Sequence, residues 1–180
     1  DNNNIQEYIG TIGYSSKEIK GRRYDFLVIN TEKPLLSKQE VRKAISYSID
    51  KDKIASQVYD NTLQASNFPL DYGTYLSSQN DSSSGYNANA AKQALVDEGW
   101  KYRYSYWQKY EDRRTQRLRF NLVVKATDDK MVEVAEKIEE QLEKQGIRIT
   151  VIQASKSRYE KYLEDKNYDM ILASMNSSLS

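Results

Sequence analysis

The chain of 180 residues contains no cysteine and no histidine. Without cysteine it can form no disulfide, no thiolate nucleophile and no thiolate metal site. Without histidine it lacks the base of a Ser-His-Asp triad, imidazole metal ligands and the usual proton shuttle near neutral pH. These two absences exclude several common kinds of catalytic and metal site within the chain.

An excess of one charge is also missing. The chain has 27 Lys and Arg against 26 Asp and Glu, a formal net charge of +1. Proteins that bind nucleic acids usually carry a large basic excess, so we expect no nucleic-acid partner. No run of apolar residues approaches the ~20 that a membrane-spanning helix needs, so the sequence predicts no such helix. The absence of cysteine fits an extracellular protein or a cytosolic one.

Tyrosine, in contrast, is abundant, with 15 copies beside 3 Phe and 2 Trp. Its large apolar ring and polar hydroxyl suit binding surfaces. Tyrosine can equally replace Phe or Leu in the core of a polar protein, and composition alone leaves both interpretations open.

The first sixty residues predict two strands followed by two helices. Strands are expected over 8–14 and 24–30, and Pro34 then stops the ladder. Ser37 and Glu40 form a capping-box pattern at the start of a helix over 37–49. Asp50 is expected to cap a second, shorter helix.

The middle of the chain has weaker patterns. Residues 60–86 contain Pro69 and many Ser and Asn, and predict a long functional or mobile loop. A helix is expected over 87–98, with Gly99 as its C-cap. A hairpin then follows, with Tyr102, Tyr104 and Tyr106 on one face of its first strand and a charged connection over 111–114.

The last third has the clearest periodicity. We predict a strand over 119–126, a helix capped by Thr127 and ended by Gly146, a strand over 147–152, a helix over 155–165 and a strand over 168–173. This β-α-β-α-β order implies parallel strands joined by right-handed crossovers. With the antiparallel strands before it, the sequence predicts an α/β domain with a mixed sheet.

Charged clusters carry little specific chemistry. The acids of the helix around 129–144 alternate with lysines at the spacing of exposed pairs, which favours a solvated face over a metal or catalytic site. Basic residues with aromatic neighbours over 20–23 and 113–119 loosely resemble a nucleic-acid platform. Such charges are typical of hairpin tips that resist aggregation, which is the interpretation we favour. We predict no metal site and no cofactor.

Residues 24–59 carry a recognisable pattern: a strand ending at Asn30, then Pro34, then V-R-K-A-I at 41–45, Tyr47 and I-D-K at 49–51. Further matching segments follow in order over 86–100, 118–124, 138–147 and 159–169. This series closely resembles the family 5 extracellular solute-binding proteins of ABC importers, which include oligopeptide and dipeptide receptors.

The resemblance implies one lobe of a type II periplasmic-binding-protein-like fold. Receptors of this family are two-lobed clamps that close on a ligand by hinge motion. Residues 1–180 resemble most of the second lobe, so we expect a fragment of a longer chain whose first lobe is missing. Arg42 and Asp50 match the family pattern, and we expect structural roles for them, as a helix-surface pair and a cap.

The resemblance also implies which residues contact ligand. In the family the segment after the final Tyr-Asp strand lines the cleft, and here it contains Ser174, Met175 and Asn176. Met175 stands near a position where the family often has Trp, and Ser178 near that of an Asp which pairs with a peptide's amino terminus. Asn30, and Tyr72 and Tyr75 from the long loop, complete the predicted set.

The function implied is capture of peptides for import, without catalysis, outside the cell as a bacterial cell-surface lipoprotein or periplasmic protein. The implied partners are the solute, the missing lobe and a membrane permease. Two alternatives stay open: a receptor of the same family for an oligosaccharide or metal complex, and a small α/β hydrolase. A hydrolase would require convergent groups with perturbed pKa values in a pocket of this chain.

Overall fold

A computed structural model of the chain describes residues 7–15, 21–59 and 85–178. Its main sheet has five strands in the order β1-β2-β8-β6-β7. Their bounds are β1 Glu7–Ser15, β2 Gly21–Ile29, β6 Arg119–Lys125, β7 Arg148–Ala154 and β8 Met170–Ser178. The β1–β2 and β2–β8 pairs are antiparallel, whereas β8–β6 and β6–β7 are parallel. The predicted α/β domain with a mixed sheet is confirmed.

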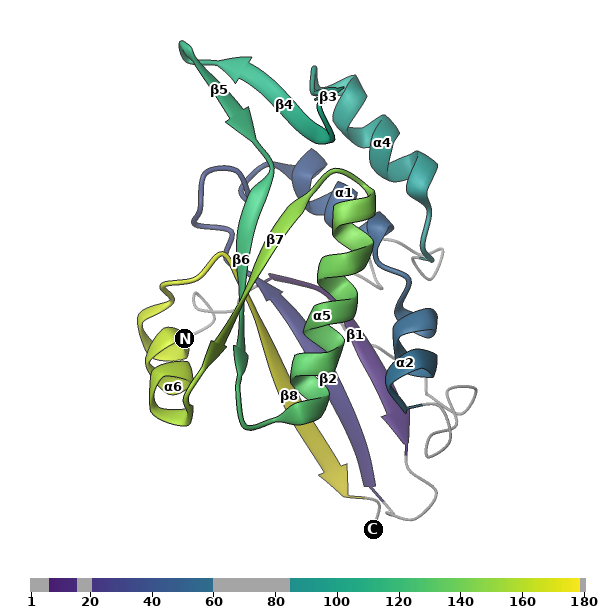
Figure 1. The fold of residues 1–180 in the computed structure, drawn as a ribbon, viewed down its shortest axis with the longest axis vertical. Helices are drawn as coiled ribbons and strands as arrows, with labels where there is room; N and C mark the ends of the chain where they lie inside the picture. Colours follow the sequence, from purple (N-terminus) through teal and green to yellow (C-terminus); the bar gives the residue numbers. More distant parts are fainter. Residues whose placement is uncertain (1–6, 16–20, 60–84, 179–180) are drawn as a thin grey trace.

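Helices α1 Gln39–Ser48, α2 Lys51–Tyr59, α5 Asp129–Lys144 and α6 Lys156–Asp165 pack on this sheet (Figure 1). Helix α4 Ala88–Asp97 packs against α1 instead. Leu122, Val123 and Val124, successive residues of β6, are all fully buried. Because successive strand residues point to opposite faces, this central strand is covered on both sides, as parallel strands usually are.

The β-α-β-α-β prediction is confirmed by the order β6-α5-β7-α6-β8. Helix α5 buries Met131, Val134, Ala135, Ile138 and Leu142, the stripe expected from its sequence. Gly146 follows it with φ of +82°, and Gly99 follows α4 with φ of +89°, both in the left-handed region that glycine adopts easily.

Two predicted helix caps were wrong. Ser37 does not cap α1. Its hydroxyl donates to the carbonyl of Pro34 at 2.6 Å, within the turn that follows this proline. Glu40 instead accepts from the indole nitrogen of Trp100 at 3.3 Å. The cap of α5 is Asp128 and not Thr127, since the Asp128 carboxylate accepts from the Met131 amide at 3.1 Å.

Asp50 and Arg42 both stabilise the region around α1. Asp50 accepts from the Lys53 amide at 3.1 Å, which confirms the predicted cap of α2, and its own amide donates to Gln141 of α5 at 2.7 Å. Arg42 donates to the carbonyls of Leu36 and Ser37, so it fixes the turn that precedes its helix.

A second, three-stranded sheet projects beyond the body of the molecule (Figure 1). It contains β3 Lys101–Arg103, β4 Tyr106–Glu111 and β5 Arg114–Arg117, all antiparallel. The prediction that Tyr102, Tyr104 and Tyr106 share one strand was wrong. The chain reverses at Tyr104 and Ser105, whose φ values of 54° and 66° are typical of a tight hairpin turn. The charged connection between β4 and β5 is confirmed.

The base of this sheet rests on Gly146. A Cβ atom added there would lie 2.5 Å from Tyr102 Cε2 and 2.9 Å from Trp107 Cδ1, whereas one added at Gly99 would meet nothing closer than Lys109 Cε at 3.8 Å. Both glycines have positive φ, so they differ mainly in the space around them.

We expect Gly146→Ala to destabilise the protein more than Gly99→Ala. Each substitution places a side chain in the left-handed region, which costs about 1–2 kcal/mol. Only Gly146→Ala adds overpacking against two aromatic rings, worth about 1–3 kcal/mol more. Urea unfolding of both variants measures the difference, and equal losses would contradict the close packing at Gly146.

Candidate functional site

The sheet has a topological switch between β8 and β6. From β6 the chain crosses to β7 on one side and then returns to β8 on the other. In open α/β sheets, ligands bind outside the carboxyl ends of the strands at such a point. This edge is where β6 leads into α5 and where β8 continues toward Ser178.

Four polar side chains meet at this edge, and we call them the Arg23 cluster: Arg23 and Asp25 of β2, Asp128 at the start of α5 and Ser174 of β8. The Arg23 guanidinium bridges the two acids. Its Nε donates to Asp25 at 3.2 Å, and its Nη2 donates to the two carboxylate oxygens of Asp128 at 2.9 and 2.8 Å. The side chain of Arg23 therefore joins two separate elements, β2 and the start of α5.

Ser174 connects β8 to this bridge. Its hydroxyl accepts from Arg23 Nη2 at 3.0 Å and donates to Asp25 in a short hydrogen bond. The Tyr59 hydroxyl at the end of α2 also donates to Asp25, at 3.4 Å. The backbone register pairs Asp25 with Ser174 and Arg23 with Asn176, which brings the side chains of β2 and β8 together.

The electrostatics of the cluster are set by burial. The Asp25 side chain is fully buried, while Arg23 and Asp128 keep about a fifth of their side chains exposed. Burial raises the pKa of the Asp25 carboxyl above its ordinary value of 3.8, and the positive charge of Arg23 acts in the opposite direction. Asp128 lies at the amino end of α5, where the helix dipole also favours a negative charge.

Tyr159 of α6 supports the same strand from another element. Its buried hydroxyl donates to the carbonyl of Leu172 at 2.5 Å. Burial, followed by the nearby charge of Asp128, raises the pKa of Tyr159 to about 12. The phenol therefore stays protonated and keeps donating to β8 across the physiological range.

Beyond the cluster, β8 turns outward. Leu172 is fully buried, but Ser174 is exposed and Met175 exposes 59% of its surface. An apolar side chain this exposed, next to a rigid polar cluster, is suited to contact with a ligand or a second lobe. Asn176 is part of β8, and its backbone pairs with Arg23.

Asn30 lies at the opposite end of β2 from this group. It is buried, and its amide nitrogen donates to the carbonyls of Lys166 and Tyr168 at 3.0 and 2.9 Å. Its side-chain oxygen accepts from the amide of Glu32. These contacts join two loops, so the structure does not bring Asn30 together with Ser174 and Met175. Tyr72 and Tyr75 lie outside the described residues.

Arg23, Asp25 and Asp128 were missed as members of a site by sequence reasoning. Arg23 reads as part of a basic turn, Asp128 as an ordinary acid at a helix start, and the two are separated by 105 positions. The signal in the sequence is Asp25. It is a charged residue at a strand position where the alternating pattern predicts an apolar residue of the core.

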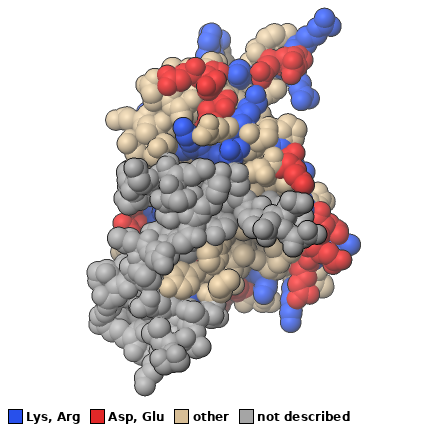
Figure 2. All heavy atoms as spheres, turned by 180° about the vertical axis from the view of Figure 1, so that it is seen from behind, with Lys and Arg blue, Asp and Glu red and all other residues tan. Residues whose placement is uncertain are grey.

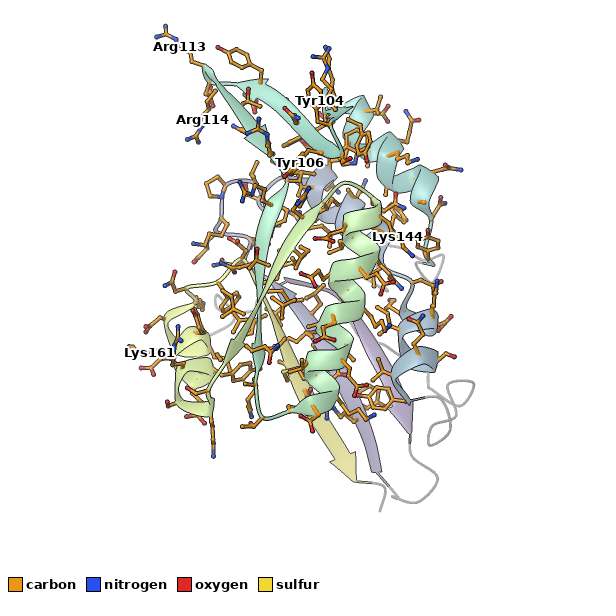
Figure 3. All side chains as sticks on the ribbon, viewed as in Figure 1. Tyr104, Tyr106, Arg113, Arg114, Lys144 and Lys161 are labelled. Atoms are coloured by element: carbon orange, nitrogen blue, oxygen red, sulfur yellow. The ribbon has the colours of Figure 1, made fainter. Side chains whose placement is uncertain are left out.

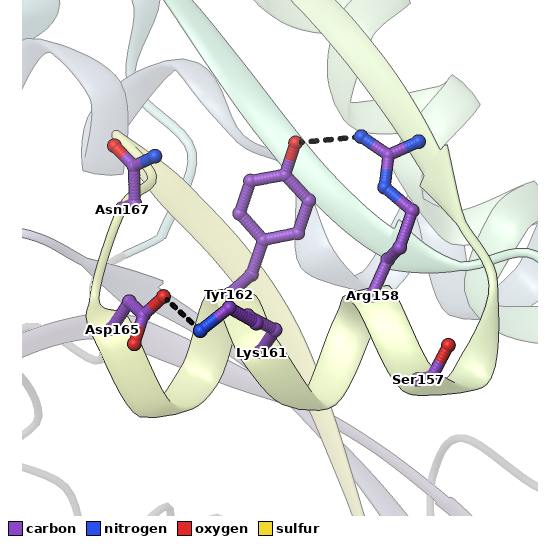
Figure 4. A pocket seen from close by; sticks show the side chains of 6 residues that line it. All are labelled: Ser157, Arg158, Lys161, Tyr162, Asp165 and Asn167. Atoms are coloured by element: carbon purple, nitrogen blue, oxygen red, sulfur yellow. Dashed lines mark hydrogen bonds and ion pairs between the residues drawn. The ribbon is translucent and has the colours of Figure 1, made fainter.

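The hollows on the described surface lie elsewhere. One, of about 440 Å³, is lined by six residues of α6 and the loop after it, including Arg158, Lys161 and Tyr162 (Figure 4). Lys161 pairs with Asp165 at 3.0 Å, and Arg158 donates to Tyr162 at 3.4 Å. The hollow contains none of the predicted site residues. Among the described residues, no group of three acidic side chains is placed to hold a metal ion.

Charge on the rear surface is mixed in sign. Figure 2 shows acidic and basic side chains interspersed over the described part of that face. None of the helices in the described ranges is both long and apolar enough to cross a membrane.

Known structures with this fold are solute-binding proteins. NikA from Brucella suis, solved with Fe(III)-EDTA, matches with a TM-score of 0.68 and 25% identity over 90% of this chain and 32% of its own. The oligopeptide-binding protein AppA from Bacillus subtilis, solved with a nonapeptide, matches with a TM-score of 0.62 and 21% identity over 98% of this chain and 32% of its own. The chain thus has the fold of about a third of a periplasmic binding protein.

The family follows from the sequence match. All 180 residues match the family described as "Bacterial extracellular solute-binding proteins, family 5 Middle", and the chain belongs to this family. It is also 31% identical over 86 residues to the peptide transport periplasmic protein SapA from Haemophilus influenzae. That match covers 47% of this chain and 15% of SapA.

We expect the buried Asp25 to make stability depend on pH. The pKa of Asp25 is higher in the folded protein than its ordinary value of 3.8. The contribution of Asp25 to the free energy of unfolding is therefore fully present below pH 3.8 and is lost as pH rises through the folded-state pKa. The free energy of unfolding of the wild type minus that of Asp25→Asn should therefore fall as pH rises above 3.8. Urea unfolding over a series of pH values above this point measures it.

A difference that stays flat or rises with pH would contradict a raised pKa at Asp25. Comparing the two proteins at each pH cancels the contributions of titrating groups that are distant from residue 25.

Proposed function

We propose that residues 1–180 form the second lobe of a two-lobed receptor that captures peptides for an ABC importer and releases them to a membrane permease. The 31% identity to a peptide transport protein supports the choice of peptide. The chain spans about a third of the solved relatives, which supports a missing first lobe. We infer an extracellular location, as a cell-surface lipoprotein or in the periplasm.

The observation that carries the proposal is the placement of Ser174 and Met175. They lie at the carboxyl end of β8, beside the topological switch, where the fold class binds ligands. The Arg23 cluster fixes this end of β8 against β2 and α5, so the exposed residues are held on a rigid support. We assign the ligand side of the lobe to Ser174, Met175 and Asn176.

The chemistry of this edge suits peptides of varied sequence. Methionine is flexible and polarisable, so Met175 can adapt to different side chains. Backbone hydrogen bonds then give affinity without selecting one sequence. In the predicted set, Tyr72 and Tyr75 remain candidates for further contacts, and the contacts of Asn30 favour a supporting role.

A second candidate is a receptor for a metal complex. The 25% identity to NikA, solved with Fe(III)-EDTA, favours it. The hydrolase alternative has less support, because the family is one of solute-binding proteins and the buried Asp25 is surrounded by protein partners.

Recovery of the natural ligand tests the substrate class. The complete two-lobed protein that contains this chain should co-purify with peptides, identified by mass spectrometry after acid release, and bind a mixed-peptide pool in calorimetry. Recovery of a metal chelate or a sugar, with no heat on adding peptides, would overturn the choice of peptide.

Met175→Ala should weaken peptide binding by the complete protein. Loss of an exposed anchor that is buried on closure costs about 1 kcal/mol, which corresponds to a roughly fivefold higher Kd. Titration calorimetry measures the change.

Val96→Ala is the matched control. Val96 exposes 53% of its surface and lies on α4, away from β8. An equal loss of affinity in both variants, or none in Met175→Ala, would remove Met175 from the ligand side.

A further inference from the structure

The projecting sheet differs in charge from the rest of the chain. Residues 101–117 contain six Lys and Arg and two Asp and Glu, a net charge of +4, whereas the whole chain carries +1. The remaining residues therefore carry a net charge of −3. The positive charge is concentrated on one appendage that extends beyond the body (Figure 1).

The two faces of this sheet have different contents. Side chains directly opposite one another in an antiparallel pair share a face. One face holds Trp107, which is buried, and Glu111, which pairs with Lys38 of the body at 3.2 Å. This face packs toward the body of the protein.

The other face, which we call the outer face, contains no acidic residue. Its rows follow from the register: Lys101, Gln108 and Arg117 lie opposite one another, as do Arg103 and Tyr106, and Tyr110 and Thr115. Glu111 lies on the inner face, and Asp112 lies in the turn at the tip. Three cations and two tyrosines therefore share one side of a short sheet.

These cations are unneutralised by the described part of the protein. Lys101, Arg103 and Arg117 make no ion pair within 4.0 Å among the described residues, and all three are exposed. Arg148 of β7 borders the face and lies over the Tyr106 ring, with its guanidinium carbon 4.5 Å from the ring centroid. That contact extends the positive surface onto the main sheet.

The ends of the appendage add aromatic and basic groups. Tyr104, in the turn between β3 and β4, is 86% exposed, and Tyr110 is 72% exposed. Arg113 lies in the turn at the tip, and Figure 3 shows it pointing away from the body, whereas Arg114 lies opposite Glu111 on the inner face. Seen from behind, basic side chains also reach the outer end of this appendage, with acidic ones beside them (Figure 2).

We propose that the outer face docks on an anionic phospholipid surface. Tyrosine and cationic side chains are the groups that settle at the head-group level of a bilayer, where the ring lies at the interface and the charge meets phosphate. A bilayer offers negative charge without a fixed geometry, so it does not require the cations to match a particular ligand shape. Docking would orient the receptor at the membrane that holds its permease, which goes beyond ligand capture.

Vesicle co-sedimentation tests the proposal. The probe is large unilamellar vesicles of phosphatidylglycerol and phosphatidylcholine in equal parts, and the protein is the complete two-lobed receptor carrying no covalent lipid. We expect binding in 50 mM NaCl, at least tenfold weaker binding in 500 mM NaCl, and none to pure phosphatidylcholine.

Charge reversal locates the surface. Arg103→Glu with Arg117→Glu should lower vesicle binding at least tenfold. The matched control, Lys53→Glu with Lys156→Glu, changes the net charge equally at exposed sites on α2 and α6, and should lower binding less than twofold. Equal losses in the two double variants, or no binding by the wild type, would overturn the proposal.

Two further readouts separate the possible outcomes. Peptide affinity in calorimetry should be unchanged in Arg103→Glu with Arg117→Glu, so that failure of the docking surface and failure of the proposed function are distinguishable. Retention of the wild type on a purified acidic protein, with no vesicle binding, would assign the face to a protein partner and overturn the lipid assignment.

Discussion

The bridge that Arg23 forms between Asp25 and Asp128 is the interaction on which the candidate site depends. It joins β2 to the start of α5, and Ser174 attaches β8 to the same group. The bridge is possible because Asp25 is buried beside a guanidinium, which offsets part of the cost of removing a carboxylate from water. Without it, the end of β8 would lose its side-chain link to α5 and would keep its backbone pairing with β2.

Strand β8 therefore has two parts, one whose residues support the fold and one whose residues are exposed for contact. Up to Leu172 the residues of β8 are buried and bonded, with Tyr159 holding the Leu172 carbonyl. Ser174 and Met175, farther along the same strand, are exposed. At its other end Asn121 and Asp169 exchange backbone-to-side-chain hydrogen bonds at 2.8 Å, which fixes β8 against β6. The strand is therefore held at this end by Asn121 and Asp169 and farther along by the Arg23 bridge.

Sequence patterns predicted elements better than the details at their ends. The stripe of α5 from Met131 to Leu142 identified a buried face correctly, because helical periodicity is a local property. The predicted caps at Ser37 and Thr127 were wrong. The Ser37 hydroxyl donates to the Pro34 carbonyl instead, and the neighbouring Asp128 caps α5 in place of Thr127. Tyr104 and Ser105 carry no usual turn signal, so a strand was expected where the chain reverses.

The sequence by itself determined the family, the mixed α/β fold and the β-α-β-α-β succession of elements along its last third. These follow from periodicity and from motifs of adjacent residues. Only the tertiary structure decided the site. It brought Arg23 to Asp128 across 105 positions, placed Asn30 at the other end of β2 from Ser174, and set Lys101, Arg103 and Arg117 on one acid-free face. Strand register and crossing decide such proximities, and neither is visible in a local pattern of residues.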